Sequence, residues 1–269
     1  MSSPAQPIPA PLPILPSVPA PAQGQRLSLS ALNGSADAAA LAQIASNRPL
    51  LVVTASPLDA QRLREEISWF ASDLRVHLLP DWETLPYDSF SPHQDLISER
   101  LATLYAIQRG EADIAIVPAA TALYRLCPPA YLAAHTFFIK QGKRLDAEKL
   151  RLQMVVAGYE HVTQVVRPGE FSVRGGLIDL FPMGSPLPFR IELFDEDVES
   201  LRTFDPDTQR TVYPVKEIRM LPAREFSLDE KGRADFRARF REQFEGDPSR
   251  STIYKDVSNG IAPGGIEYY

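Results

Sequence analysis

The first half of the chain alternates short apolar runs with stretches of helical periodicity, and this alternation limits the possible folds more than any other feature. The apolar runs have the length of buried strands and lie at residues 50–55, 76–79 and 114–117. Ser56 and Pro57 form a typical N-cap and first helical position for a helix to about residue 70, and a second helix is predicted to begin at Ser91. Strands that alternate with helices form parallel sheets. The sequence therefore predicts a domain of the α/β class.

The pattern changes near residue 140, where short segments with period-two alternation begin. Asp146 is a typical N-cap for a helix that ends at Gly158. The segments after this helix are separated by turn sequences and are predicted as strands at residues 162–166, 171–181, 189–194, 198–204 and 215–221. Short strands joined by tight turns form antiparallel sheets. The sequence therefore predicts a small antiparallel α+β domain at residues 140–222, inserted between two segments of the α/β domain at residues 26–139 and 223–269.

Residues 167–182 combine a turn signal, alternating side chains and an unshielded cation. A Pro-Gly pair opens the stretch, and Arg174 precedes two glycines that cannot cover its side chain. This pattern predicts a hairpin or a bulged strand that displays a binding face. Phe171 and Phe181 lie in the same stretch, where each is either a partner contact or a strand residue that faces the core.

The two ends of the chain differ from its middle. Residues 1–25 hold eight prolines among Ala, Ser and Gln, a composition that favours extended chains and has little to bury. We expect a disordered tail there, and a ligand for proline-recognition domains is the alternative. Residues 225–244 have a polar, helical pattern, and the chain stops on two tyrosines directly after an apolar segment. From this abrupt stop we expect the N-terminal part of a longer protein.

No motif for catalysis, for a cofactor or for a metal is found in the sequence. A phosphate loop needs Gly-x-x-x-x-Gly-Lys-Ser/Thr, whereas the nearest stretch, residues 32–39, has no lysine and places Asp37 where it would repel phosphate. The acidic residues at 195–199 lack the spacing of a calcium loop, and the four histidines are scattered. Cys127 is the single cysteine and is expected to be a small core residue. We therefore predict a chain that is not an enzyme and that holds no cofactor or metal.

Residues 81–93 form a loop rich in aromatic residues directly after a predicted strand. In open α/β sheets, ligands bind near the loops at the carboxyl ends of the strands. The alternative interpretation is structural, because aromatic side chains also pin long loops to a domain.

Charge and hydropathy exclude some classes of partner. The chain has 28 basic and 34 acidic residues and a net charge of −6, so the overall composition carries no electrostatic signature of a nucleic-acid-binding protein. It has no apolar run near the roughly 20 residues that a membrane helix needs and no signal peptide pattern. We therefore predict a cytoplasmic protein without a membrane partner that does not bind DNA strongly on its own.

Four segments of the chain together resemble one family. They are residues 81–95, 171–184, 204–211 and 265–269, and they closely resemble bacterial transcription-repair coupling factors over roughly residues 27–269. The resemblance implies an N-terminal module similar to the excision-repair protein UvrB. Such a module is a helicase-like α/β domain in two segments, degenerate and without a Walker A loop, interrupted by a small domain that binds UvrA.

The resemblance also assigns the remaining activities of the family to other domains. ATP and Mg would serve only a C-terminal translocase, and RNA polymerase and DNA would be bound by C-terminal domains that this chain lacks. An intramolecular contact between the UvrB-like module and the C-terminal part is compatible with the family pattern.

By position, the resemblance implies a surface for UvrA on the small domain. Its candidate residues are Tyr159, Glu160, His161, Arg167, Phe171, Ser172, Arg174 and Phe181. Arg174 matches the Arg-Gly of the family, whereas Ser172 and His161 stand at positions that correspond to arginines in UvrB. The predicted function is a non-catalytic module that recruits UvrA to stalled RNA polymerase for nucleotide excision repair. The alternative is a UvrB-like DNA-binding or damage-sensing module.

Overall fold

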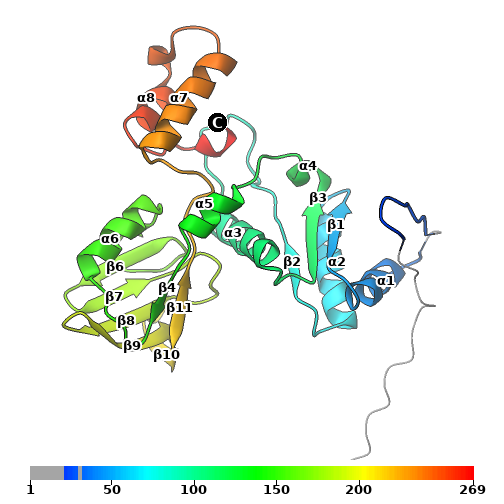
Figure 1. Ribbon diagram of the computed structural model, residues 1–269, viewed down its shortest axis with the longest axis horizontal. Coiled ribbons are helices and arrows are strands. Elements are labelled where there is room, and N and C mark those ends of the chain that lie inside the picture. Colours follow the sequence, from blue (N-terminus) through cyan, green and yellow to red (C-terminus); the bar gives the residue numbers. More distant parts are fainter. Residues whose placement is uncertain (1–20, 30–31) are drawn as a thin grey trace, which may run out of the picture.

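The computed structural model describes residues 21–29 and 32–269 of the chain. Most of the proline-rich tail predicted at residues 1–25 lies outside the described residues. An α/β layer, a curved antiparallel sheet and a pair of helices near the C-terminus make up the rest (Figure 1). The α/β layer and the antiparallel sheet lie on either side of helices α3 (Gln94–Arg109) and α5 (Pro129–Ala134).

The predicted α/β layer is present. Its strands β1 (Leu50–Thr54), β2 (Val76–Leu78) and β3 (Ile114–Pro118) are parallel and have the order β1-β3-β2. Strand β3 is buried along its whole length because it lies between the other two strands. Helices α1 (Ala36–Ala45) and α2 (Pro57–Phe70) pack on one face, and short α4 (Ala119–Ala122) follows β3. The fold of this part is therefore α/β, as predicted.

Of the two helix starts predicted in this layer, one is confirmed and the other is wrong. Ser56 Oγ accepts a hydrogen bond from the Asp59 amide (3.2 Å) and caps α2 as expected. The prediction that the next helix begins at Ser91 is wrong, because α3 begins at Gln94 after His93. The Ser91 hydroxyl has other partners, since it accepts from the Gly265 amide (3.1 Å) and donates to Glu267 (3.0 Å).

The second half contains the predicted antiparallel sheet, which has six strands in the order β10-β9-β8-β7-β6-β5. Its strands are β5 (Glu160–His161), β6 (Glu170–Arg174), β7 (Leu177–Leu180), β8 (Phe189–Phe194), β9 (Asp197–Phe204) and β10 (Thr211–Pro214). All neighbouring pairs are antiparallel except β5 and β6, which are parallel. Of the two predicted forms of residues 167–182, the hairpin is present, with a turn at Gly175 (φ +62°) and Gly176 between β6 and β7.

Two predictions about these strands are wrong, and one strand was not predicted. Residues 162–166 form no strand, β10 was not expected, and residues 215–221 belong to another sheet, in which β11 (Glu217–Met220) pairs with β4 (Phe137–Lys140). The apolar pattern of residues 162–166 has a different cause. Val165 is fully buried against Phe181 and Phe204, so this segment crosses one face of the sheet rather than extending it.

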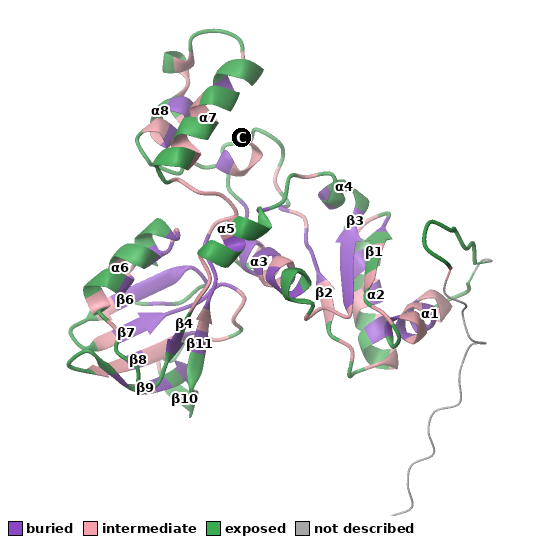
Figure 2. Ribbon diagram, viewed as in Figure 1, coloured by how far each residue is buried: buried purple, intermediate pink, exposed green. Residues whose placement is uncertain are grey.

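Helix α6 (Ala147–Val156) covers the other face of the six-stranded sheet. Asp146 caps it as predicted, because its carboxylate accepts from the Lys149 amide (3.0 Å). Leu150 and Met154 are buried in the cluster that also contains Phe171 and its neighbours on β7. Figure 2 shows that buried residues concentrate in β3 and in the middle of the antiparallel sheet, whereas α7 is exposed over most of its length.

The C-terminal residues form α7 (Glu230–Gln243), α8 (Thr252–Ser258) and two short 3-10 turns, η1 (Pro248–Arg250) and η2 (Ile266–Tyr268). The helix predicted to begin at residue 225 begins five residues later, because the Asp229 carboxylate caps it by accepting from the Gly232 amide (2.7 Å). Among the described residues, no helix combines the length and the apolar character required to cross a bilayer.

The aromatic loop at residues 81–93 is pinned to the domain by its own side chains. Trp82 is buried, stacks on Tyr124 (ring centroids 5.1 Å apart) and meets the edge of Tyr268 (5.0 Å). The Tyr268 hydroxyl donates to the Thr84 carbonyl oxygen (2.5 Å). These contacts support the structural interpretation for Trp82 and Thr84, and they join the loop to the C-terminal turn η2.

Cys127 lies in the core, as expected, and this position sets its reactivity. Only 6% of its surface is exposed, and burial raises the pKa of its thiol to about 12. At pH 8 we expect the thiol of the folded chain to react with a thiol reagent such as Ellman's reagent on the order of a thousandfold more slowly than an exposed cysteine. Reaction should become fast when the chain is unfolded in urea. Rapid labelling of the native chain would contradict the buried position.

Candidate functional site

The face of the antiparallel sheet opposite α6 carries a row of polar side chains. The strand register places Ser172, Asp179, Arg190 and Arg202 side by side on β6, β7, β8 and β9. Residues in register point to the same face of a sheet. The apolar partners of α6 occupy the alternate positions, so this row faces away from the helix.

A buried carboxylate holds two arginines on this face. Asp179 has 1% of its side chain exposed and accepts from Arg190 through both guanidinium nitrogens that face it, Nε (2.7 Å) and Nη2 (2.9 Å). Arg174 Nη2 donates to the same carboxylate at 2.5 Å. The guanidinium of Arg190 also lies over the Phe204 ring (4.9 Å) and donates to the Gln209 carbonyl oxygen (3.2 Å). The hydrogen bonds to Asp179 raise the pKa of Arg190, so this guanidinium remains cationic.

The end of this face near Phe181 is covered, whereas the end near the β6–β7 turn is open. Val165 and its neighbours cover Phe181 and Phe204, as described above. At the open end, the Arg174 side chain is 53% exposed and Phe194 is 73% exposed. Leu193 packs against the hydrophobic cluster under α6, so Phe194, the next residue on β8, points to the opposite face, as Arg190 does. We call Arg174, Asp179, Arg190 and Phe194 the arginine face.

Three of these residues were missed by the sequence-based prediction, which named only Arg174. The signal was the alternation along β8, in which Arg190, Glu192 and Phe194 share one face of the strand. The burial of Asp179 could not be predicted in this way. An Asp that alternates with apolar residues in a strand is normally expected to face the solvent.

A second group of predicted residues lies at the edge of the sheet. Arg167 Nε donates to Glu170 (2.8 Å), and Arg167 Nη2 donates to Glu160 (3.4 Å). Glu160, His161 and Arg167 are exposed, and the His161 ring packs against Phe171 (5.0 Å between centroids). These three side chains are therefore accessible to a partner, although they lie near Glu170, at the opposite end of β6 from Arg174.

Four of the predicted partner-binding residues are buried and are therefore not surface contacts. Tyr159, Phe171, Ser172 and Phe181 have between 0% and 6% of their surface exposed. The Tyr159 hydroxyl donates to the Leu221 carbonyl oxygen (2.7 Å) and accepts from the Met183 amide (3.2 Å). Phe171 and Phe181 fall on opposite faces of the hairpin and are each enclosed by a hydrophobic cluster. These residues support the sheet from which the arginines project.

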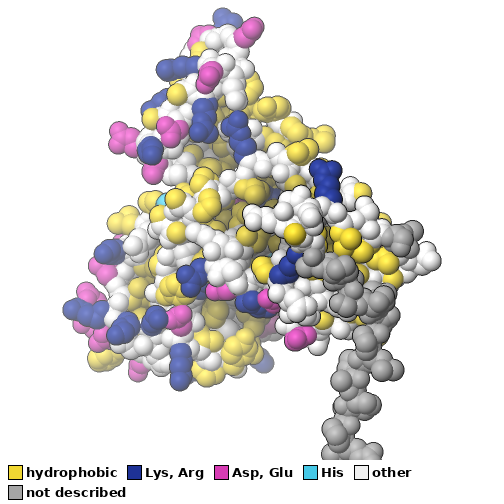
Figure 3. Space-filling model, turned by 45° about the vertical axis from the view of Figure 1, so that its right-hand side comes forward, with side chains coloured by type: hydrophobic (Ala, Val, Ile, Leu, Met, Phe, Trp, Pro, Cys, Tyr) yellow, Lys and Arg dark blue, Asp and Glu magenta, His cyan; other side chains and the backbone are white. Residues whose placement is uncertain are grey.

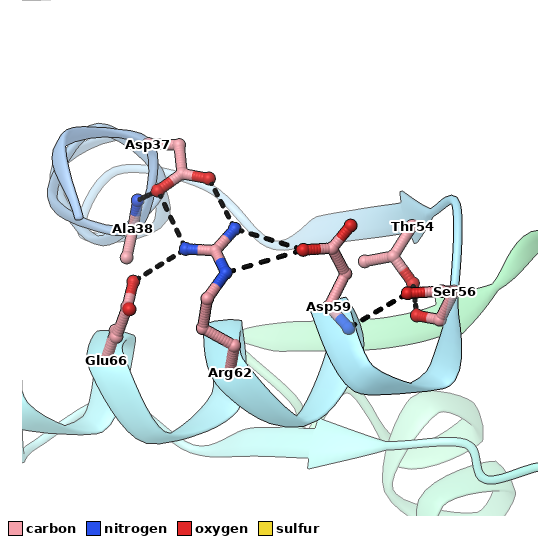
Figure 4. A network of polar contacts seen from close by, with 7 residues as sticks. All are labelled: Asp37, Ala38, Thr54, Ser56, Asp59, Arg62 and Glu66. Atoms are coloured by element: carbon pink, nitrogen blue, oxygen red, sulfur yellow. Dashed lines mark hydrogen bonds and ion pairs between the residues drawn. The ribbon is translucent and has the colours of Figure 1, made fainter. Parts of the chain in front are cut away.

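The α/β layer has acidic side chains near the connection at which nucleotide-binding α/β proteins hold phosphate. The connection from β1 to α2 consists of Ala55 and Ser56, too short for a phosphate loop. Beside the first turns of α2, Arg62 binds Asp37 (2.8 Å), Asp59 (3.4 Å) and Glu66 (2.8 Å), as Figure 4 shows. Hydrogen bonds from Arg62 lower the pKa of Asp37.

Among the described residues, no group of three His, Cys, Asp or Glu side chains is arranged to hold a metal ion. In the acidic turn at residues 195–199, Glu196 forms an ion pair with Arg144. This turn connects β8 to β9, as its sequence predicted.

Comparison with known proteins identifies a matching domain family and several relatives of this chain. Residues 137–226 match the family model described as the UvrB interaction domain. The chain is 46% identical over 255 residues, or 94% of its length, to the transcription-repair-coupling factor of Escherichia coli (strain K12). It is also 46% identical to that of Haemophilus influenzae and 34% identical, over 77% of its length, to that of Bacillus subtilis.

The chain belongs to the transcription-repair-coupling factor family. It spans 22% of the length of the E. coli and H. influenzae relatives. The segment that matches the UvrB interaction domain includes the six-stranded sheet and the β4–β11 pair, and therefore all of the arginine face. The resemblance read from the sequence is thus confirmed.

Proposed function

We propose that this chain is the UvrB-like N-terminal module of a transcription-repair-coupling factor, and that it recruits UvrA to stalled RNA polymerase for nucleotide excision repair. The observation that carries this proposal is the arginine face, which lies within the segment that matches the UvrB interaction domain. Glu160, His161 and Arg167 are proposed to lie at the edge of the same contact.

The arginine face has the features of an interface centre. Arginines and aromatic residues are enriched at the centres of protein interfaces. Here Arg174 and the ring of Phe194 are both exposed on the same face, and Asp179 fixes the orientation of the guanidinium groups before any partner binds. A preorganised surface loses less side-chain entropy on binding. We propose that carboxylates of UvrA pair with these guanidinium groups.

We propose that the module itself is not an enzyme. The short connection from β1 to α2 and the carboxylates around Arg62 offer no phosphate site. ATP and Mg, RNA polymerase and DNA would be bound by other domains of the whole protein. In that protein, the C-terminal part would cover the arginine face, so that the isolated module should bind UvrA more tightly than the whole protein does.

The helicase-like arrangement in two segments is also a proposal. It is supported by the contacts of residues 223–269 with the first segment, since Glu225 pairs with Arg100 of α3 and Tyr268 packs on Trp82. The inserted sheet is connected to both segments through residues 137–140 and 217–220, which pair with each other.

Replacing Arg174 by alanine is expected to weaken UvrA binding by more than about tenfold, because truncation of an interface hot spot costs about 2 kcal/mol or more. The measurement is capture of purified UvrA by the immobilised chain over a range of concentrations. Arg151→Ala is the matched control, since Arg151 lies on α6 at the opposite face of the sheet. Undiminished capture by Arg174→Ala would refute the site, and no capture by the wild type would refute the function.

A UvrB-like DNA-binding or damage-sensing module is the second candidate function. The basic side of α7 is the observation that favours it. ATP hydrolysis by the purified chain would instead favour an enzymatic module and would contradict the non-catalytic role.

A further inference from the structure

Helix α7 places three arginines along one side. Arg233, Arg237 and Arg241 are spaced by four residues, so each lies about 6 Å farther along the same side of the helix. The helical spacing puts Asp235 and Glu242 on another side, while Glu230 in the first turn lies on the side of the arginines. Within residues 21–29 and 32–269, none of the three arginines forms an ion pair with a carboxylate. The stripe therefore carries charge that the fold does not neutralise.

The aromatic side of α7 holds this stripe in a fixed orientation. Phe240 is buried against Tyr254 of α8 (5.3 Å) and Phe236 lies beside it (5.6 Å). The guanidinium of Arg241 lies over the Tyr254 ring (5.6 Å), and Arg233 Nε donates to the Asp229 carbonyl oxygen (3.4 Å). The aliphatic parts of the arginines are thus supported by the helix pair, while their charge remains available.

Exposed aromatic rings continue from the C-terminal end of α7. Phe244 ends the helix and meets the edge of Tyr87 (6.0 Å), which also contacts Tyr269 (5.2 Å). Tyr87 is 58% exposed and Phe90 is 69% exposed. Exposed aromatic rings near cations are typical of surfaces that bind unpaired bases.

The backbone at Tyr87 is strained in a way that presents its ring. Tyr87 has φ +64°, in the left-handed region that is uncommon for bulky residues. Such strain persists only where surrounding contacts impose it, and it concentrates at functional sites. Here the contact is close packing of the Gly264–Gly265 backbone against Asp88 and Ser89, which leaves no room for a side chain at either glycine.

We propose that α7 and these aromatic residues form a binding surface for single-stranded nucleic acid. The three arginines would neutralise backbone phosphates, and Tyr87 and Phe90 would stack on unpaired bases. Figure 3 shows Lys and Arg side chains, interspersed with Asp and Glu, beside hydrophobic side chains in the upper part of the molecule, where α7 and α8 lie. The surface is local in a chain of net charge −6, so binding should be modest and sensitive to salt. It does not depend on the proposed recruitment of UvrA.

The test is fluorescence anisotropy of a labelled oligothymidylate of about 12 nucleotides, within the site sizes of single-strand binding domains, titrated with the full chain at several salt concentrations. Three phosphate contacts predict a slope of log K against log salt of about −2, since each contributes about 0.7 on single strands. Replacing Arg233, Arg237 and Arg241 by glutamine should weaken binding at least about tenfold at low salt and bring the slope close to zero.

Two further variants test the stacking. Phe90→Ala and Tyr87→Asn should each weaken binding at least about fivefold, the lower end for loss of one stacked base. Asparagine is chosen because it tolerates the left-handed backbone better than alanine does. Circular dichroism establishes that each variant is folded before its binding is measured.

The matched control replaces Arg109 on α3, Arg151 on α6 and Arg202 on β9 by glutamine, which changes the net charge equally on other elements than α7. It should retain at least half of the wild-type affinity. The proposal is overturned if the control loses as much affinity as the stripe variant, or if the wild type does not bind at low salt. It is also overturned if a DNA duplex or polyglutamate binds as tightly as the oligothymidylate.

Discussion

Replacing Asp179 by alanine is expected to weaken UvrA binding more than tenfold and to lower the free energy of unfolding by about 2–3 kcal/mol. The carboxylate makes three hydrogen bonds to arginines, two to Arg190 and one to Arg174. Its loss leaves the mostly buried guanidinium of Arg190 without a counter-charge, which is the costly way to break such a pair. The expected loss of unfolding free energy is small for a broken buried ion pair, because Arg174 is half exposed and water can hydrate its guanidinium. Urea unfolding and UvrA titration measure the two effects.

A double variant separates the role of Asp179 in orienting the arginine side chains from its role in the stability of the fold. Replacing Asp179 by leucine together with Arg190 by methionine removes the charges as a pair, and apolar replacement of a buried pair is often neutral for stability. We expect this variant to regain most of the unfolding free energy and still to bind UvrA poorly. Glu192→Gln on the same face, where Glu192 accepts from Ser200 (2.6 Å), is the control that should change neither quantity by much. Full binding by the double variant would show that Asp179 acts only through stability.

The parts of the fold that were predicted correctly depend on contacts between nearby residues. The strands of the α/β layer, the N-caps of α2 and α6 and the hairpin at Gly175 are each determined within a short stretch of chain. The pairing of β4 with β11 joins residues about 80 positions apart, and no local pattern specifies such a partner. Val165 is a similar case, because its burial under a crossing loop gives the same apolar signal as a strand.

The candidate site shows the same limit at the level of single residues. Arg174 could be predicted, because two glycines follow it and leave its side chain uncovered. Phe171 and Phe181 could not be assigned, because both faces of the sheet carry hydrophobic clusters and alternation alone does not say which face is open. The arginine face is recognised only when Asp179 and Arg190 are placed opposite each other in the strand register.

Replacing Glu225 by alanine is expected to have the largest effect on stability, about 3–5 kcal/mol. Glu225 follows strand β11, and it binds Arg100 of α3 through two hydrogen bonds, at 2.5 Å and 3.2 Å. The Arg100 side chain is fully buried, its Nη1 donates to the Pro80 carbonyl oxygen (2.7 Å), and its guanidinium lies over Trp82 (4.8 Å). Without Glu225, the buried guanidinium of Arg100 loses its only carboxylate partner among the described residues.

The same pair also joins parts of the chain that are distant in sequence. Glu225 lies at the end of the segment that matches the UvrB interaction domain, and Arg100 belongs to the first α/β segment. We therefore expect Glu225→Ala to expose the chain near residue 225 to trypsin before the antiparallel sheet unfolds. Glu217→Ala is the matched control, because Glu217 pairs with Lys140 at the surface and exposed pairs contribute about 0–1 kcal/mol. Equal losses in the two variants would mean that the Arg100–Glu225 pair does not hold the two segments together.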